Sequence, residues 1–312
     1  MTGASPPMLN GGAVAVLINP GGGSVGADQS KLRAIGDALA GAGIDSAPEL
    51  VDGGAIAERA RAAVESGAEL LIVGGGDGTV GAAAGALAGS DTALGILPLG
   101  TLNHFARDLG IPLGLAEAAE LIAGGVARTV DIAEMNGRIF VNNSAIGLYP
   151  HLVIDRESQQ DRLGRGKRLA MAVAALRTLA RFHRQRLTLA VNDEKARLDT
   201  PLLFVGNNRY RMALPGPGRR DSLDDGELCV MVMRRKTRTG FVAAMVRALA
   251  GRARAEDMVY IDGVTRLRVT GPRRLAVSLD GETIHITPPI DYRLRPRALK
   301  VIAPQPATSQ AM

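Results

Sequence analysis

Residues 70–79 read Leu-Leu-Ile-Val-Gly-Gly-Gly-Asp-Gly-Thr, and this stretch decides the fold. Its four apolar residues predict a buried strand, which the three glycines are expected to end. Thr79 then opens an alanine-rich stretch, 80–88, that predicts a helix. A strand, a glycine turn and a helix N-terminus favour an anion, because backbone N–H groups and the positive end of the helix dipole face one point. The stretch therefore predicts a phosphate-binding turn.

The carboxylate of Asp77 lies in this turn and limits which ligands the turn can bind. It would repel a bare phosphate, so we expect it to bind Mg²⁺, a ribose or a backbone group. A Walker-type P-loop is excluded, because no Gly-Lys-Ser/Thr follows. Gly76, Gly78 and Gly81 have the spacing of a dinucleotide fingerprint, but the next strand runs into Pro98-Leu99-Gly100-Thr101 and not into an acidic residue. A glycine turn without a ligand is the remaining alternative.

Strands and helices alternate in the first third of the chain, which implies a parallel sheet with right-handed crossovers. Strands are predicted at 13–18, 44–51, 70–73 and 93–97, with helices at 31–42 and 55–66. Glycine turns follow three of these strands, at 21–23, 74–76 and 100. They would meet at the carboxyl edge of one sheet, where open α/β sheets bind ligands. This convergence predicts a nucleotide site.

From residue 127 the pattern changes to short strands, which predicts an antiparallel second domain. The first two, 127–135 and 139–145, are joined by Asn136-Gly137, a strong hairpin signal. The others are predicted at 186–191, 196–198, 202–207, 227–233, 258–261, 266–270, 275–279 and 283–286. Residues 298–303, near the end of the chain, contain enough apolar residues for one further strand. Residues 162–186 break the pattern, with an apolar helical stripe flanked by Arg177, Arg181 and Arg184. Either a membrane-surface helix or a packed helix with a solvated basic edge fits them.

Composition limits the partners of this 312-residue chain. Its net charge of +6 and pI of 9.9 suit nucleic acid, an anionic membrane or a polyphosphate ligand. Nucleic acid is disfavoured, because tryptophan is absent and aromatic residues make up only 3%. The one cysteine excludes a disulfide framework. Without a signal peptide or a membrane-spanning apolar run, a cytoplasmic protein, peripheral to the inner face of the membrane, is expected.

Gly-Gly-Asp-Gly-Thr at 75–79 resembles the nucleotide signature of the diacylglycerol kinase catalytic-domain family, to which sphingosine kinases and, more distantly, NAD kinases are related. Four further segments match in order, at 98–109, 131–147, 221–228 and 279–282. The resemblance covers about 13 to 303. It implies an N-terminal parallel α/β nucleotide-binding domain, 11–130 with 296–304 returning, and a C-terminal antiparallel β-sandwich domain, 131–295. Residues 305–312 are expected to form a disordered tail.

The resemblance also implies ATP and Mg²⁺ as cofactors and assigns residues to them. Nucleotide binding is expected from Asn19, Pro20, Gly21, Gly22, Gly23, Gly74, Gly75, Gly76, Asp77, Gly78, Thr79, Thr101 and Asn103. Thr101 and Asn103 are expected to cap a short helix. A structural Mg²⁺ is expected at Ser222, Asp225 and Glu227, partly through backbone carbonyls; an ordinary acidic turn is the alternative.

Asp280 resembles the family's general base, with Glu282 in support, and the alternative is a routine Asp-Gly hairpin turn. The active site would then lie in the cleft between the domains. His104 departs from the family, in which many members carry an aspartate, and this puts the Mg²⁺ network in doubt.

The expected function is ATP-dependent phosphorylation of a hydroxyl on a membrane lipid such as diacylglycerol, with a role in phospholipid biosynthesis. Alternatives are an NAD kinase-like enzyme with a soluble substrate, or a nucleotide- or lipid-binding regulator without transfer activity. No Asn-Glu pair follows the glycine turn, which counts against the NAD kinase alternative. The partners expected are ATP, the lipid and an anionic membrane surface, with a homodimer as a possible assembly.

Overall fold

The computed structural model describes residues 13–21, 29–147, 184–191, 194–211, 218–235, 237–249, 255–271 and 274–305. The chain divides into an N-terminal unit, residues 1–132 and 295–312, and a C-terminal unit, residues 133–294. Two strands, β5 (Val126–Met135) and β16 (Ile290–Ala303), run from one unit into the other. Most of the predicted helix at 162–186 and nearly all of the predicted tail lie outside the described residues.

The N-terminal unit is built on a parallel sheet in the order β2-β1-β3-β4-β16. Its other strands are β1 (Val14–Ile18), β2 (Glu49–Leu50), β3 (Leu70–Gly75) and β4 (Ala93–Pro98). Lys300 and Val301 of β16 pair in parallel with β4, so the end of the chain returns to this sheet. Every residue of β3 and β4 is buried, as is typical of central strands covered on both faces.

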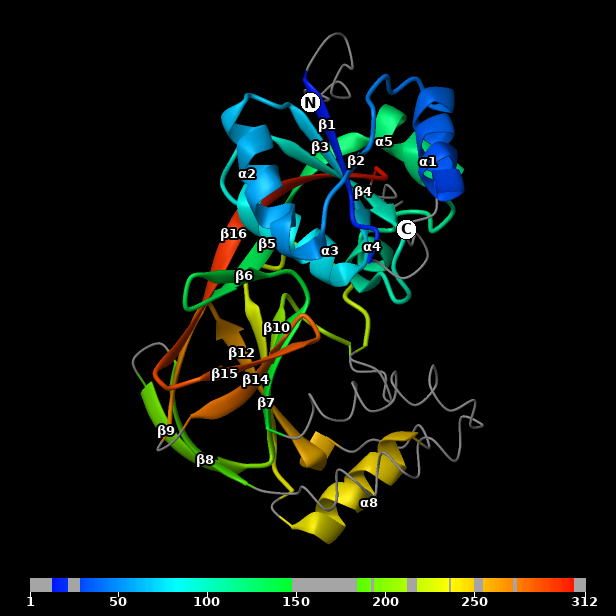
Figure 1. Cartoon of the computed structure of the whole chain (residues 1–312). Coiled ribbons are helices and arrows are strands. Elements are labelled where there is room, and N and C mark those ends of the chain that lie inside the picture. Colours follow the sequence, from blue (N-terminus) through cyan, green and yellow to red (C-terminus); the bar gives the residue numbers. More distant parts are fainter. Residues whose placement is uncertain are drawn as a thin grey trace, which may run out of the picture. The chain divides into compact units, whose positions relative to one another are not determined.

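Helices cover both faces of this sheet. They are α1 (Gln29–Gly41), the 3-10 turn η1 (Gly53–Ala55), α2 (Ile56–Glu65), α3 (Asp77–Leu87), α4 (His104–Asp108) and α5 (Leu115–Gly124). Helix α1 packs with α5 and α2 with α3, and Figure 1 shows the two pairs on either side of the strands. Ile56, Ala60 and Ala63 are the buried residues of α2, at the spacing of one helix face.

The predicted end of the central strand is wrong. β3 continues through Gly74 and Gly75, which pair with Ile18 of β1 and Pro98 of β4. Glycine is compatible with an extended backbone, and hydrogen bonds to both neighbours hold the strand to its last residue. Helix α3 accordingly begins at Asp77, three residues before the predicted start at residue 80. The strand predicted at 44–51 is also too long, since only Glu49–Leu50 pairs with β1.

The C-terminal unit contains two antiparallel sheets. One includes β16, β13, β8 and β9 in that order, with β5 paired to β16 and β6 to β5; the other has the order β12-β11-β10-β7-β14-β15. Their strands are β6 (Arg138–Phe140), β7 (Asn143–Gly147), β8 (Gln185–Val191), β9 (Glu194–Thr200), β10 (Leu202–Asn207), β11 (Leu228–Met233), β12 (Met258–Val264), β13 (Arg266–Thr270), β14 (Leu275–Leu279) and β15 (Glu282–Ile286). Buried side chains from both sheets form one core, including Tyr292, Leu267, Leu203 and Val277. The predicted fold class is confirmed.

Two features of this unit differ from what the sequence predicts. β8 begins at Gln185, so the last two residues of the stretch predicted as helical, 185 and 186, belong to a strand, and Arg184 forms an ion pair with Asp199 of β9. A helix that the sequence did not predict, α8 (Arg238–Leu249), follows β11 and is succeeded by the 3-10 turn η2 (Ala255–Asp257). Of the helices that the structure describes, none is long and apolar enough to cross a membrane.

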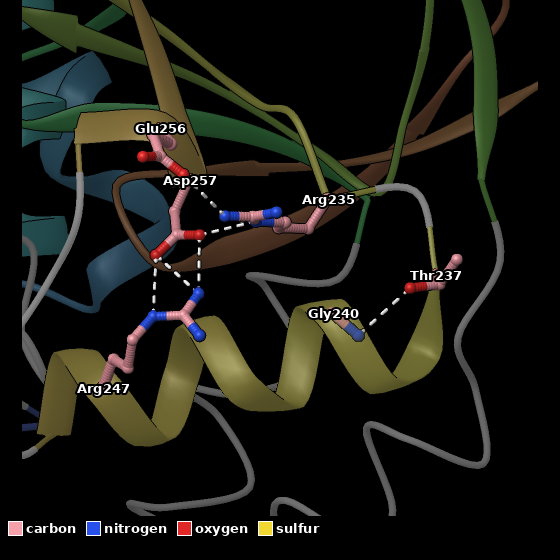
Figure 2. A network of polar contacts seen from close by, with 6 residues as sticks. All are labelled: Arg235, Thr237, Gly240, Arg247, Glu256 and Asp257. Carbon is pink, nitrogen blue, oxygen red and sulfur yellow. Dashed lines mark hydrogen bonds and ion pairs between the residues drawn. The ribbon is translucent and has the colours of Figure 1, made fainter.

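An acidic residue between two arginines anchors α8 (Figure 2). Asp257 is buried and accepts hydrogen bonds from Arg247 of α8, at 2.7 Å, and from Arg235 after β11, at 2.6 Å. Burial acts to raise the pKa of Asp257, but the two arginines outweigh it and hold that pKa below its usual value. Thr237 caps α8 by accepting the N–H of Gly240. Arg235 and Arg247 therefore fix this helix through Asp257.

Candidate active site

The carboxyl ends of β1, β3 and β4 meet at one edge of the N-terminal sheet. The carbonyl of Gly75 accepts the N–H groups of Leu99 and Gly100, both at 3.1 Å. Asn19 after β1 donates its side-chain N–H to the hydroxyl of Thr79 at 2.8 Å, and its backbone N–H to the carbonyl of Gly74 at 2.9 Å. The structure thus brings together the predicted residues after the three strands.

Two glycines at this edge are required by close packing, one within a turn and one between two turns. A Cβ atom on Gly75 would lie 2.5 Å from the hydroxyl oxygen of Thr79. A Cβ atom on Gly100 would overlap the Cα atom of Gly76 and lie 2.8 Å from the side-chain oxygen of Asn103. Real Cβ contacts are longer, so a side chain at Gly75 would displace Thr79 and a side chain at Gly100 would push the two turns apart. Gly100 therefore keeps the two turns in direct contact, and Gly75 leaves room for Thr79.

Asp77 is the first residue of α3, and its carboxylate holds the next turn. It accepts the backbone N–H groups of His104 and Phe105, each at 3.1 Å, at the start of α4. Of the ligands predicted for Asp77, the backbone group is the one observed. The carboxylate also lies at the N-terminus of α4, where negative charge is favourable.

The predicted capping of α4 by Thr101 and Asn103 is wrong. Asn103 is the N-cap residue, but it has a left-handed backbone with φ of 51° and its side chain makes no cap bond. Its amide instead donates to the carbonyls of Pro98 and Gly100 and accepts the N–H of Gly100 at 3.0 Å. The Asp77 carboxylate takes the place of the cap, which local spacing cannot reveal. Thr101 is exposed.

The remaining predicted nucleotide residues lie around this edge. Pro20 is half-buried, and Gly21 donates its N–H to the side chain of Asn19 at 2.9 Å. Gly78 is exposed and Gly76 half-buried at the start of α3. Gly22 and Gly23 lie outside the described residues.

Asp280 lies in the hairpin turn between β14 and β15. Asp280 and Gly281 have φ of 45° and 92°, and Leu279 pairs with Glu282 across the turn. Asp280 thus stands in the Asp-Gly turn itself, and Glu282 is the first residue of β15, one position before the predicted start of that strand. Glu282 is exposed, and its side chain makes no hydrogen bond or ion pair within the described part of the chain.

The Asp280 carboxylate binds a segment far away in the sequence. One oxygen accepts the N–H of Val141 at 2.8 Å, and the other accepts those of Asn142 and Asn143 at 2.8 and 3.0 Å. Asp280 returns its own N–H to the carbonyl of Asn143. This segment breaks the single strand predicted at 139–145 into β6 and β7. The predicted strand therefore breaks at the residues whose backbone N–H groups donate to the Asp280 carboxylate.

Arg220, which no sequence pattern marks, binds carbonyl and side-chain oxygens of the same segment. Its guanidinium is buried, with 3% of the residue exposed, and donates to the carbonyl of Val141 and to the side-chain oxygen of Asn142 at 2.8 Å. It also lies 5.1 Å from the ring centre of Tyr210, within cation–π range. No spacing or motif marks an arginine between Arg219 and Asp221 for this role.

Opposing effects set the protonation of Asp280. Burial disfavours the charged carboxylate and raises its pKa from 3.8 to about 6. The three backbone N–H groups and the charge of Arg220 act in the other direction. The carboxylate is therefore mostly ionised at neutral pH, yet more basic than an exposed aspartate, which is the property a general base needs.

The residues predicted to hold Mg²⁺ mostly bind protein groups. The carboxylate of Glu227 forms an ion pair with Arg209 and accepts the N–H of Gly263 at 2.7 Å. Asp225 accepts the backbone N–H of Arg209 at 3.2 Å, and the hydroxyl of Ser222 bonds to Asp224.

A cavity of about 410 Å³ is lined in part by two of the residues predicted to hold Mg²⁺, Asp225 and Glu227. In the part of the chain that the structure describes, no three His, Cys, Asp or Glu side chains gather to hold a metal. The side chains alone thus do not make a Mg²⁺ site, and the site stays a prediction.

Two family models match this chain and define the class of protein to which it belongs. The model "Diacylglycerol kinase catalytic domain" matches residues 13–135, and the model "YegS C-terminal NAD kinase beta sandwich-like domain" matches residues 153–303. The N-terminal unit with its parallel sheet and the C-terminal β-sandwich agree with these two matches. They place the chain among kinases that combine such a catalytic domain with a β-sandwich domain. The chain belongs to the diacylglycerol kinase catalytic-domain family.

Individual relatives agree with this assignment. The chain is 31% identical over 248 residues to a probable lipid kinase YegS-like of Pseudomonas aeruginosa, covering 78% of this chain and 79% of the relative. It is 28% identical over 218 residues to a diacylglycerol kinase of Bacillus subtilis, covering 69% and 71%. The crystal structure of a putative diacylglycerol kinase from Bacillus anthracis matches with a TM-score of 0.74 at 27% identity, covering 93% of this chain and 97% of that one.

Proposed function

We propose that this protein is a lipid kinase that transfers the γ-phosphoryl group of ATP to a hydroxyl group of a membrane lipid such as diacylglycerol. Membership in a kinase family supports phosphotransferase chemistry, and the names of the relatives support a lipid acceptor. The observation that carries the proposal is the packing of the glycine turn at the start of α3 against the turn at Gly100 after β4, held by Asp77 and Asn103.

In this proposal the phosphates of ATP bind at the N-terminus of α3, along residues Gly76 to Thr79. Helix α3 has 11 residues, and its N-cap residue, Gly76, offers no side-chain cap, so the positive end of the dipole is available to an anion. Asn19 and Thr79 hold this turn against the end of β1. No step of the proposal depends on the predicted Mg²⁺ site.

Asp280 acts as the general base. The lipid hydroxyl oxygen forms a bond to the γ-phosphorus while the bond from that phosphorus to the β–γ bridging oxygen breaks, and ADP leaves with the electron pair. The hydroxyl proton passes to the Asp280 carboxylate, whose pKa of about 6 leaves it ionised at neutral pH. That Asp280 and the glycine turns act in one cleft between the domains stays a prediction, as does a homodimer.

The experiment is transfer of labelled phosphate from ATP to a panel of acceptors. The panel contains vesicles with diacylglycerol, a sphingoid base or phosphatidylglycerol, and soluble NAD as the alternative acceptor. Label in one lipid supports the proposal and names the substrate. Label in NAD alone would establish the soluble-substrate alternative. A folded protein that binds ATP but labels nothing would favour the regulator, with His104→Asp as the variant that tests restoration of transfer.

A further inference from the structure

The outer face of one sheet in the C-terminal unit carries a concentration of positive charge. In β13 and β16, Arg266 lies directly opposite Arg293. The register of β8 and β9 puts more basic residues on the same face, because their neighbours Leu187 and Leu189 point into the core. We call the six exposed cations the basic sheet face: Arg186, Lys195, Arg197, Arg266, Arg268 and Arg293.

The carboxylates on this face neutralise little of its charge. Asp291 forms an ion pair with Arg268, at 2.5 Å. Asp199 is paired with Arg184, which precedes β8, at 2.8 Å. The other five cations form no ion pair within 4 Å with any residue that the structure describes, although Asp199 lies opposite Arg186 in the register and the charge of Arg293 helps to lower the pKa of Asp291. Like charges directly opposite each other, as in Arg266 and Arg293, destabilise a sheet, so this arrangement costs the isolated protein stability.

Protection of a sheet edge explains only part of this pattern. β9 is the edge strand, and Lys195 and Arg197 on it would discourage pairing with other chains. Arg266 and Arg293, however, lie on β13 and β16, which have partner strands on both sides. Edge protection therefore does not account for the opposed pair, and an anionic partner would relieve its repulsion.

The neutral residues on this face indicate which anion fits. Between the cations lie the short side chains of Thr188, Ala190 and Thr270. A face without aromatic or large apolar side chains has nothing to stack on nucleic acid bases and nothing to insert into acyl chains. Arginine and lysine can still bind phosphate headgroups side by side. We propose that the basic sheet face docks on the anionic headgroups of a membrane, an inference that rests on the proposed function because the substrate is a membrane lipid.

The test compares two double variants that lose the same net charge. Arg197→Gln with Arg266→Gln removes two cations from the basic sheet face, and Arg33→Gln with Arg61→Gln removes two exposed cations from α1 and α2. Each cation near an anionic bilayer strengthens binding about fivefold, so the first variant is expected to bind about 25-fold more weakly. Binding is measured by sedimentation with vesicles of phosphatidylcholine and phosphatidylglycerol in equal parts, and with phosphatidylcholine alone.

The outcomes separate this inference from the proposed function. The control variant should bind like the wild type, and salt should weaken wild-type binding. Equal loss in both variants, or loss equal on neutral vesicles, would overturn the inference. So would wild-type binding to duplex DNA that is tighter than to anionic vesicles. Alongside the vesicle binding, the rate of diacylglycerol phosphorylation is measured in nonionic detergent micelles, and both double variants should retain the wild-type rate. A wild type inactive in micelles contradicts the proposed function, whatever the vesicles show.

Discussion

Two aspartates of this protein, Asp77 and Asp280, both bind backbone N–H groups of another loop through their carboxylates. The loop bound by Asp77 lies close in the sequence, and the one bound by Asp280 lies far away. Asp77 accepts two backbone N–H groups from the turn that follows the neighbouring strand. Asp280 accepts three from a segment almost half the chain away in sequence, and the buried Arg220 donates to a carbonyl of that segment. In each place the carboxylate fixes a loop. The comparison teaches that an acidic residue in a family signature can hold the site together as well as take part in its chemistry.

The largest effect is expected from Asp280→Asn. If Asp280 is the base, turnover should fall by roughly 10²–10⁴-fold. The structure adds a second consequence, because an Asn NH₂ group would face a backbone N–H where a carboxylate oxygen now accepts one. That mismatch should cost about 1–3 kcal/mol of unfolding free energy. Kinase rates and thermal unfolding measure the two effects, with Asp262→Asn, in another Asp-Gly pair with an exposed carboxylate, as the control. Full activity with reduced stability would leave Asp280 a purely structural residue.

Gly100→Ala tests the loop that Asp77 holds while leaving the carboxylate in place. The new Cβ would meet the backbone of Gly76, which cannot move aside as a flexible side chain can. We expect a loss of about 1–3 kcal/mol in stability, with weaker ATP binding. The matched control is Gly36→Ala in α1, where nothing lies within 4 Å of the new Cβ. Unchanged ATP affinity in the Gly100 variant would separate the packed turns from the nucleotide site.

A pH dependence follows from the raised pKa of Asp280. Since that pKa is about 6, the rate should fall about tenfold for each unit of pH below 6, as the base becomes protonated. The stability effect has the opposite sign. Between about pH 4 and 6 the folded state holds this proton more tightly than the unfolded chain does, so raising the pH through this range lowers the free energy of unfolding. Rates and melting temperatures of the wild type and Asp280→Asn across this range check both, and a wild-type rate that is flat from pH 5 to 7 would contradict the assignment.

The parallel half of the fold could be predicted because its signals are local. Strand, glycine turn and helix alternate, and the residues after three strands do meet at one edge. The Asn136-Gly137 hairpin was likewise correct, with φ of 48° and 81° at the two residues. In each case a few neighbouring residues contain the whole physical cause.

The errors arose where the cause lies far away in the sequence. The strand at 139–145 breaks because Asp280, which follows it by more than a hundred residues, takes its N–H groups. The cap of α4 comes from Asp77 and not from Asn103 beside it. Arg220 carries no local signal at all. Hydrogen bonds between distant residues leave no periodicity, so only the folded chain reveals them.

A moderate effect is expected from Asp77→Ala, which removes the acceptor at the start of α4. Losing a helix cap costs typically about 1 kcal/mol, so the fold should survive. If the α4 turn forms part of the nucleotide site, the affinity for ATP should fall about fivefold, with a parallel loss of turnover. Calorimetry with ATP and the kinase rate give the two values. A folded variant with unchanged ATP affinity and rate would show that this turn does not bind the nucleotide.

The smallest effect is expected from Glu282→Gln, and it bears most directly on which carboxylate is the base. Glu282 is exposed and, unlike Asp280, it binds no backbone N–H group of the described chain. Substitutions at such surface positions change stability by about 0.5 kcal/mol or less, so we expect a rate within about twofold of the wild type and an unchanged melting temperature. The kinase rate of Glu282→Gln is measured beside that of Asp280→Asn, with the double variant as the third sample. If the double variant is no slower than Asp280→Asn, Glu282 takes no proton. If Glu282→Gln abolishes transfer while Asp280→Asn keeps it, the base is Glu282, and the buried carboxylate with its three N–H groups serves, like Asp77, to hold a loop in place.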